Sequence, residues 1–404
     1  MGIYLSPPGL VCCAGNNRDQ VFEAAIRGDQ GGIKPVCLFG GKTFPVGRID
    51  AVKLSAPGTY TTETRLIRIA DAALEQILPQ VEQVLAAYGS SRIAVCVGSC
   101  DNGSEGSLRA HGAYFSGGAF PADYELRFQG AGFPAEYIAH KFGLSGPVLA
   151  VSTACASSAG AVIKGAEFIR AGLCDAVIAG GADLASELAL AGFDSLEALS
   201  GAVCNPFSKN RQGITLGDGA AFFVMAADKS LFRENGGGIE LLGAGESADA
   251  FHMTAPRSDG SGAIRAMEAA LADAGVNAAD VDYINLHGTG TRLNDSMEAL
   301  AVAAVFRDSL PPVSSTKPIT GHTLGAAGAL ELALCWMLLS RDSRNAALPV
   351  HCWDGVYDEE LPRLRFAGKE AVALSGAPQI CMSNSFAFGG CNVSLLLGRD
   401  YGKG

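Results

Sequence analysis

The chain has 404 residues, of which 48% are hydrophobic and 18% charged, and its formal net charge is −11. This balance excludes an intrinsically disordered protein, and a chain of this length can bury a large apolar core without disulfide bonds or metals. The acidic balance argues against broad nucleic-acid binding. The twelve cysteines form no CxxC pair and the first residues lack the basic region of a secretory signal, so we expect reduced thiols, a cytoplasmic location and no membrane span.

Short apolar runs alternate with alanine-rich stretches along the chain. The runs typical of buried strands are Arg92–Gly98, Pro147–Ser152, Ala176–Ala179 and Tyr283–Leu286. The stretches typical of helices include Ala159–Ala171 and Ala263–Ala274. This alternation predicts an α/β protein with parallel strands and helices on both faces of the sheet.

The clearest break in this pattern is the glycine-rich segment Asn235–Gly238, which follows a charged stretch. We interpret it as the boundary between two halves of similar layout, residues 1–235 and 236–404. No repeat of identical residues is visible between the halves, so the sequence does not itself establish a duplication.

The first candidate site is Cys155, in the segment STACASSAG between an expected strand and an expected helix. Backbone N–H groups and the helix dipole at such a junction favour the thiolate form, and the small neighbours leave room for a substrate. Taken alone, the pattern is more typical of a packed cysteine in a strand–helix turn.

Two histidines lie in glycine-rich segments further along the chain. His287 opens LHGTGTRLND after a strand, at a sheet edge where active sites of α/β proteins collect. His322 lies in KPITGHTLGAAG, with Lys317 five residues before it and Glu331 in the following helix. A buried Lys317–Glu331 pair would compensate both charges, whereas the alternative is a solvated surface pair. Either histidine, taken alone, is also compatible with a structural role.

The last glycine-rich segment is NSFAFGGCN, whose two phenylalanines could form a mobile apolar wall or the core of a hairpin. Other kinds of site are not supported. The six histidines include neither HExxH nor an i,i+4 pair, so we expect no metal site. No GxGxxG follows an expected strand, so we expect no dinucleotide site.

The order of these segments is more specific than any one of them. The series STACASS, NPFSKNRQGITLGDGA, DAFHMTAPRSDGSG, LHGTGTRLND, KPITGHTLGAAG and NSFAFGGCN closely resembles β-ketoacyl-[acyl-carrier-protein] synthases, the elongating Cys-His-His branch of the thiolase-like superfamily. The resemblance implies a dimer of thiolase-like five-layer αβαβα chains, each built from two similar halves. It also implies decarboxylative condensation of malonyl on acyl carrier protein with an acyl group on Cys155. The substrates would ride on the carrier's 4′-phosphopantetheine, with no further cofactor and no metal.

The resemblance also implies roles for individual residues. Cys155 matches the acylated nucleophile, and His287 and His322 match the imidazoles that face the malonyl thioester. Lys317 matches a buried lysine behind the second histidine, His322, and Glu331 matches its acidic partner. The other matches are Thr289 and Thr291 for the pantetheine arm, the backbone N–H groups of Cys155 and Phe388 for the oxyanion hole, Phe386, Ala387 and Phe388 for the gate, and Arg65 and Arg68 for docking of the carrier protein.

Some positions depart from the family pattern. Ala387 replaces a glycine between the gating phenylalanines, and because alanine tolerates positive φ poorly, the gate would move differently. Such departures fit a specialised pathway, such as aryl-polyene or type II polyketide synthesis, better than a housekeeping role in fatty-acid synthesis. The alternatives are a thiolase with Cys391 as a second thiol, and a chain-length-factor-like subunit that has lost its nucleophile. The intact Cys155 fits the active partner of such a subunit better, so both a homodimer and a heterodimer are open.

Overall fold

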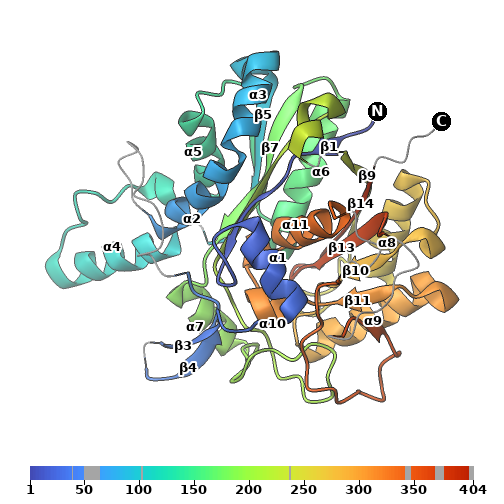
Figure 1. Cartoon of the computed structure of the whole chain (residues 1–404). Helices are drawn as coiled ribbons and strands as arrows, with labels where there is room; N and C mark the ends of the chain where they lie inside the picture. Colours follow the sequence, from blue (N-terminus) through green and yellow to red (C-terminus); the bar gives the residue numbers. More distant parts are fainter. Residues whose placement is uncertain are drawn as a thin grey trace.

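The structure is a computed structural model that describes residues 1–38, 40–49, 64–101, 103–235, 238–341, 347–368 and 377–399. Helices and strands alternate along most of these residues (Figure 1). The strands are β1 (Tyr4–Leu5), β2 (Gly9–Cys12), β3 (Lys34–Cys37), β4 (Thr43–Val46), β5 (Ile93–Gly98), β6 (Val148–Val151), β7 (Ala176–Asp183), β8 (Gly219–Ala226), β9 (Ile239–Ala248), β10 (Tyr283–Asn285), β11 (Pro312–Ser314), β12 (Arg365–Phe366), β13 (Ile380–Phe386) and β14 (Cys391–Arg399). The α-helices are α1 (Arg18–Arg27), α2 (Arg65–Leu74), α3 (Leu78–Tyr88), α4 (Ser104–Gly117), α5 (Phe133–Lys141), α6 (Ser157–Arg170), α7 (Glu187–Ser195), α8 (Ser261–Ala274), α9 (Arg292–Phe306), α10 (Lys317–Thr320) and α11 (Ala327–Leu339).

The large sheet contains the same strand order twice. In the N-terminal half the order is β6-β5-β7-β8-β1, and in the C-terminal half it is β11-β10-β13-β14-β9. In each set the first three strands are parallel to one another, the fourth strand is antiparallel to the third, and the fifth strand is antiparallel to the fourth. Strand β1 also pairs with β9 and so joins the two sets. The predicted two similar halves are therefore confirmed in the topology, although their side chains differ.

The strands and helices form five layers (Figure 1). Alternate residues of β5 face opposite ways: Ile93, Val95 and Val97 pack with the outer helices α2, α3 and α5, whereas Ala94 and Cys96 join the central core. That central core contains α6 and α11, which lie between the two halves of the sheet. Helices α8 and α9 cover the outer face of the C-terminal half. All thirteen residues of α11 are buried, as expected for a central helix that is apolar on every side.

Most predicted elements lie where the sequence places them, with one difference in burial. The run Pro147–Ser152 forms β6, but β6 is the edge strand of the sheet and Val148 is 44% exposed, so the predicted burial is wrong. The predicted domain boundary stays a prediction, because residues 236 and 237 lie outside the described residues. In the described ranges, no helix has the length and apolar character needed to cross a membrane. All twelve cysteines fall within these ranges and are free thiols.

Two equivalent turns bring the halves together at the centre of the molecule. Each is a three-residue 3₁₀ turn that leads directly into a central helix: Ala154–Ala156 precedes α6, and Leu324–Ala326 precedes α11. The first residue of each turn has a positive φ, 49° at Ala154 and 50° at Leu324. The two turns contact each other, so the residues they carry share one site.

Candidate active site

Cys155 lies in the turn between the edge strand β6 and the central helix α6. Its residue surface is 7% exposed. The left-handed backbone at Ala154 costs about 1–2 kcal/mol for a residue other than glycine, and the surrounding structure holds it. The backbone N–H of Phe388, from the far half of the chain, lowers the pKa of the thiol. The thiol is thus fixed between segments that lie far apart in the sequence.

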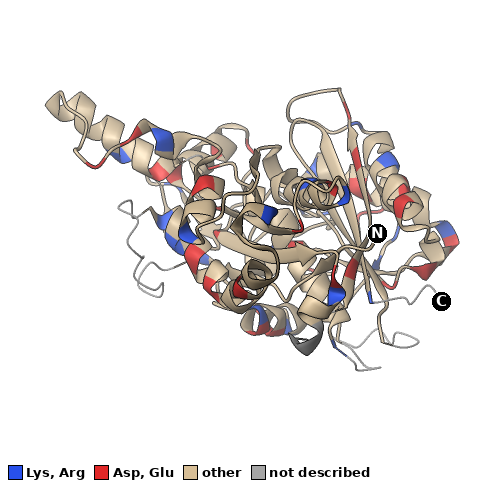
Figure 2. Ribbon diagram, turned by 90° about the horizontal axis from the view of Figure 1, so that it is seen from above, with Lys and Arg blue, Asp and Glu red and all other residues tan. Residues whose placement is uncertain are grey.

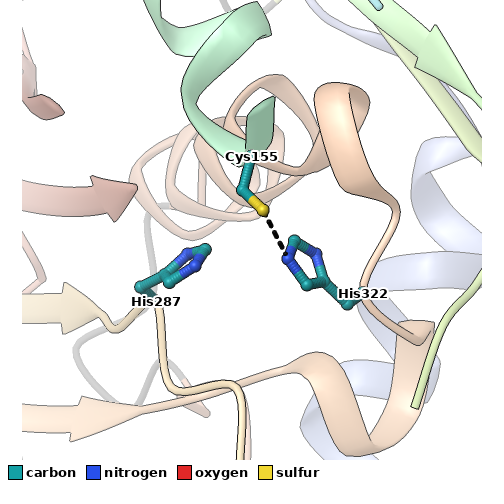
Figure 3. Close-up of side chains that lie close together, drawn as sticks. All are labelled: Cys155, His287 and His322. Carbon is teal, nitrogen blue, oxygen red and sulfur yellow. Dashed lines mark hydrogen bonds between the residues drawn. The ribbon is translucent and has the colours of Figure 1, made fainter. Parts of the chain in front are cut away.

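The two predicted histidines converge on this thiol, as Figure 3 shows. His322 Nε2 lies 3.0 Å from Cys155 Sγ. The rings of His287 and His322 are almost perpendicular, with centroids 5.3 Å apart. In the described part of the chain, Cys155, His287 and His322 are the one group of such donors that could hold a metal ion, with ligand atoms within 4.8 Å of one another. A pattern search for HExxH misses such a set because its members come from three separate segments.

Lys317 and Glu331 form a buried ion pair, with side chains 1% and 2% exposed. From the sequence, Lys317 is expected to lie behind His322, but the lysine contacts the other histidine. Its Nζ instead donates to the His287 carbonyl and lies 3.4 Å from His287 Nδ1. The prediction is wrong about which histidine is contacted, because α10 directs Lys317 toward the neighbouring strand-end loop. A lysine donor at Nδ1 leaves the ring proton of His287 on Nε2, which faces the cavity.

The ionisation states of the site follow from burial. Burial raises the pKa of the Cys155 thiol to about 12, although Lys317 and the Phe388 N–H lower it. Burial and the Lys317 charge hold the pKa values of His287 and His322 well below 6.5. The resting site therefore holds a neutral thiol and two neutral imidazoles. This corrects the expectation of a thiolate at the helix start, because burial outweighs the local helix effect.

Two buried carboxylates that sequence reasoning missed hold the His287 loop. Glu298 accepts the backbone N–H groups of His287 at 2.8 Å and Gly288 at 2.7 Å. Asp295 accepts the N–H of Thr289 at 3.1 Å. Burial raises the pKa of both carboxyls, that of Glu298 to about 8. Asp295 and Glu298 are three residues apart in α9, a spacing that in the sequence is typical of a solvated helix face.

A third missed carboxylate, Asp183, joins the two halves beneath the site. It accepts backbone N–H groups from Gly325 at 2.6 Å, Asp101 at 2.7 Å and Cys100 at 2.9 Å. A side chain at Gly325 would lie 2.6 Å from the Asp183 carboxylate, which explains the glycine in the turn before α11. Burial raises the pKa of Asp183 to about 7. The signal was an aspartate ending an otherwise apolar strand, AVIAGGAD.

Two cavities meet at Cys155. The first, of about 370 Å³, reaches Cys155, His287 and His322 and is lined along one wall by Thr289 and Thr291. The hydroxyls of these threonines bond to each other at 2.9 Å. The second cavity, of about 320 Å³, also reaches Cys155. Its other lining residues are Cys100, Asp101, Ser104, Ala154, Ser186, Leu188, Ala189, Phe193, Leu324 and Phe388.

Phe388 lines both cavities. Its ring lies 5.8 Å from the ring of Phe193, and both side chains line both spaces. Phe386 lies beside His287, with ring centroids 6.4 Å apart. Ala387 does not have a positive φ, so it carries none of the strain expected from the sequence; the left-handed residues are Gly389 and Gly390 instead. Alanine is therefore compatible with this arrangement of the loop.

The two arginines expected to dock the carrier protein are not equivalent. The side chain of Arg65 is 14% exposed and pairs with Glu105 at 2.7 Å and with the buried Asp218. Two carboxylates therefore already neutralise the charge of Arg65, and its docking role stays a prediction. Arg68 is partly buried, and its Nε has no hydrogen-bond partner among the described residues. Its role stays a prediction.

Comparison with known proteins agrees with this geometry. Residues 58–230 match the beta-ketoacyl synthase N-terminal domain, and residues 239–350 match the C-terminal domain. The 3-oxoacyl-[acyl-carrier-protein] synthase 2 of Coxiella burnetii is 33% identical over 99% of each chain. The enzyme of the same name from Vibrio cholerae is 34% identical over 98% of this chain and 99% of its own.

Solved structures are similar over the same extent. A ketosynthase from Xenorhabdus doucetiae, solved in complex with its chain length factor, is 40% identical, with a TM-score of 0.88 over 98% of each chain. The ishigamide ketosynthase/chain length factor is 28% identical, with a TM-score of 0.87 over 98% of this chain and 99% of that one. The fold is thus the thiolase-like fold of ketosynthases. The chain belongs to the β-ketoacyl synthase family and is an acyltransferase of the 3-oxoacyl-[acyl-carrier-protein] synthase type.

Proposed function

We propose that this protein joins an acyl group held on Cys155 to a malonyl group on acyl carrier protein, releasing CO₂ and a 3-oxoacyl thioester. The observation that carries the proposal is the position of Cys155 Sγ, 3.0 Å from His322 Nε2, in a cavity also lined by His287. Groups held this close to one reacting centre can act on one substrate without first searching for it.

The first step is transfer of the acyl group to Cys155. The sulfur attacks the acyl thioester, the carbon–sulfur bond to the carrier arm breaks, and the thiol proton ends on the departing arm. The backbone N–H groups of Cys155 and Phe388 would stabilise the tetrahedral oxyanion, and one such donor contributes about 3–4 kcal/mol in other enzymes. The Phe388 N–H already lowers the pKa of the thiol.

The second step is loss of CO₂ from the malonyl group. The bond to the carboxylate carbon breaks, and its electron pair passes into an enolate on the thioester oxygen. His287 and His322 would donate Nε2–H to this oxygen. For His287, Lys317 beside Nδ1 favours that tautomer. For His322, the buried Nδ1 has no partner among the described residues, and an unprotonated nitrogen is the less costly group to leave there.

The third step joins the two carbon units. The enolate carbon attacks the acyl carbonyl, the bond to Cys155 breaks, and the released thiolate takes up one proton. The product leaves as a 3-oxoacyl thioester on the carrier. The second cavity, which Phe388 also lines, would hold the acyl chain. Both cavities must exclude water during this step, because water would hydrolyse the acyl-enzyme.

The protein partner that we propose is a second related chain. The exposed surface formed by β6 and α4 in the N-terminal half is suited to bind it. Among described residues, β6 pairs only with β5 and leaves its outer edge open. Helix α4 projects from the body (Figure 1) and carries few charges (Figure 2). It presents Phe115, 82% exposed, and Tyr114, which stacks on Phe120 at 4.6 Å. A large exposed aromatic surface of this kind is typical of a protein interface. Because the Xenorhabdus relative binds a chain length factor, such a subunit is the partner we propose.

The thiolase alternative requires Cys391 as a second thiol in the reaction cavity. Asn392 and Gly390 line that cavity, whereas Cys391 does not. The chain-length-factor alternative requires a lost nucleophile, but Cys155 is present and aligned with His322. Both observations favour a condensing enzyme.

Intact-protein mass spectrometry with acyl carriers tests the proposal. The wild type should gain the mass of one acyl group, Cys155→Ala should gain none, and Cys391→Ala should behave as wild type. Malonyl carrier should then release CO₂ and remove the adduct. An adduct that persists in Cys155→Ala would refute the assignment of the nucleophile.

A further inference from the structure

Arg292 is a cationic side chain in the reaction cavity that the mechanism above does not use. It is the first residue of α9, it is exposed, and it lines the cavity that ends at Cys155. Its backbone carbonyl accepts a bond from Arg211 at 3.5 Å. Within the described residues its guanidinium has no ion pair or hydrogen bond, whereas Arg65 and Arg211 are both paired with carboxylates.

The loop from His287 to Arg292 runs from the bottom of this cavity to its mouth. Burial decreases along the loop: His287 is 1% exposed, Thr289 is 6% exposed, Thr291 is partly buried and Arg292 is exposed. All four side chains line the same cavity. The buried carboxylates of Glu298 and Asp295 accept hydrogen bonds from the backbone of this loop and so fix its course. Arg292 therefore has a fixed place at the outer end of a channel whose inner end is the thiol.

A substrate arm bound in this channel has a definite direction. Its thioester must lie at Cys155, so the end attached to the carrier protein lies at the mouth. That end of a phosphopantetheine arm is a phosphodiester anion. Arginine presents a planar set of N–H donors that matches phosphate oxygens. Resting on the proposed function, we propose that Arg292 binds the phosphate of the carrier's arm and thereby sets how deeply the thioester enters.

The other charged groups at the mouth sharpen this assignment. Glu197, also exposed, lines the same cavity and would repel a phosphate. Arg257, the residue after the cavity-lining Pro256, is paired with Asp259 at 2.8 Å. Among the described residues, Arg292 and Glu197 are the charged side chains that line this cavity without an ion pair, and they should act in opposite directions. Removing Arg292 should weaken selection for the phosphate, and Glu197→Gln should strengthen it.

Two small probes separate phosphate recognition from carrier recognition. Acylation of Cys155 is followed by intact mass with an acyl-pantetheine thioester and with the same acyl group on phosphopantetheine. In the wild type, the phosphorylated probe should react with about fivefold higher kcat/KM, since an exposed ion pair is worth up to about 1 kcal/mol. Added salt should reduce this preference. In Arg292→Ala the preference should vanish, in Arg292→Lys it should be partly kept, and in Arg27→Ala, which alters an exposed arginine of α1, it should be unchanged.

Each other outcome counts against the inference. Equal rates for the two probes in wild type overturn it, and so does an Arg292→Ala variant that slows both probes equally, since that indicates a structural role. A defect only with the intact carrier protein assigns Arg292 to the carrier's surface instead. If neither probe acylates wild-type Cys155 while the mass of the intact protein is unchanged by any acyl carrier, the proposed function itself fails.

Discussion

Replacing Lys317 with methionine tests what the buried ion pair does. Lys317 and Glu331 are almost fully buried, and Nζ also contacts the carbonyl and Nδ1 of His287. Methionine keeps the apolar stem but removes the charge, so Glu331 is left buried and unpaired. Removing one partner of a buried ion pair costs about 3–5 kcal/mol. We expect Lys317→Met to lose that amount from the free energy of unfolding in urea.

The loss should depend on pH in one direction. Burial raises the pKa of Glu331 from 4.5 to about 7 with Lys317 beside it, and without Lys317 the pKa rises further. A raised pKa means that the folded state favours the protonated carboxyl, so stability from this group falls as pH rises through that window. At low pH the Glu331 carboxyl is neutral, so replacing Lys317 lowers the free energy of unfolding only a little. The deficit of Lys317→Met should therefore be larger at about pH 8 than at about pH 5.

A double variant separates stability from positioning. Lys317→Met with Glu331→Leu removes both charges and should recover most of the unfolding free energy, because apolar replacements of buried ion pairs are often neutral. It should not recover malonyl decarboxylation, because nothing then holds the ring proton of His287 on Nε2. Circular dichroism in urea and CO₂ release are the two measurements. Full decarboxylation in the double variant would refute the positioning role, and wild-type stability of Lys317→Met at both pH values would refute the ion-pair argument.

Three further predictions concern the thiol and the imidazoles. Alkylation of Cys155 by iodoacetamide should accelerate about tenfold per pH unit up to about pH 10, because burial raises the thiol pKa to about 12; a plateau near pH 8 would contradict this. His287→Ala should slow CO₂ release from malonyl carrier far more than acylation of Cys155, and equal loss of both steps would argue against its role. Zn²⁺ should slow acylation reversibly by bridging Cys155, His287 and His322, with recovery on chelation; inhibition that is unchanged in His287→Asn and His322→Asn would exclude this site.

The parts of the molecule that the sequence predicted well are those set by local pattern. The alternation of apolar runs and alanine-rich stretches placed β5, β7 and α6 within a few residues. The three reactive residues were identified because their segments occur in one family order, although each segment alone is ambiguous. The burial of β6 was not predictable in this way, because the burial of a strand depends on how many neighbours pair with it, and β6 has one among the described residues.

Three of the errors involve contacts between distant segments. Lys317 lies five residues before His322 in the chain but contacts His287, thirty residues away. Arg65 has the pattern of a solvated helix residue, yet its partner Asp218 lies 153 residues further along. The helix start at Cys155 favours a thiolate locally, whereas burial by both halves decides the pKa. In each case the neighbours in the sequence predict one contact or ionisation state, and packing between segments that are distant in the sequence produces a different one.

The repeated topology explains why the nucleophile and one imidazole meet at all. The turns Ala154–Ala156 and Leu324–Ala326 occupy equivalent places in the two halves, and each has a left-handed first residue before a central helix. The middle residue is Cys155 in one turn and Gly325 in the other, where only a glycine fits against Asp183. The C-terminal turn carries no side chain at this position, and His322, just before the turn, lies with Nε2 3.0 Å from the sulfur. Equivalent backbones thus hold different chemistry, one half supplying the thiol and the other the imidazole, which is why no repeat is visible in the residues themselves.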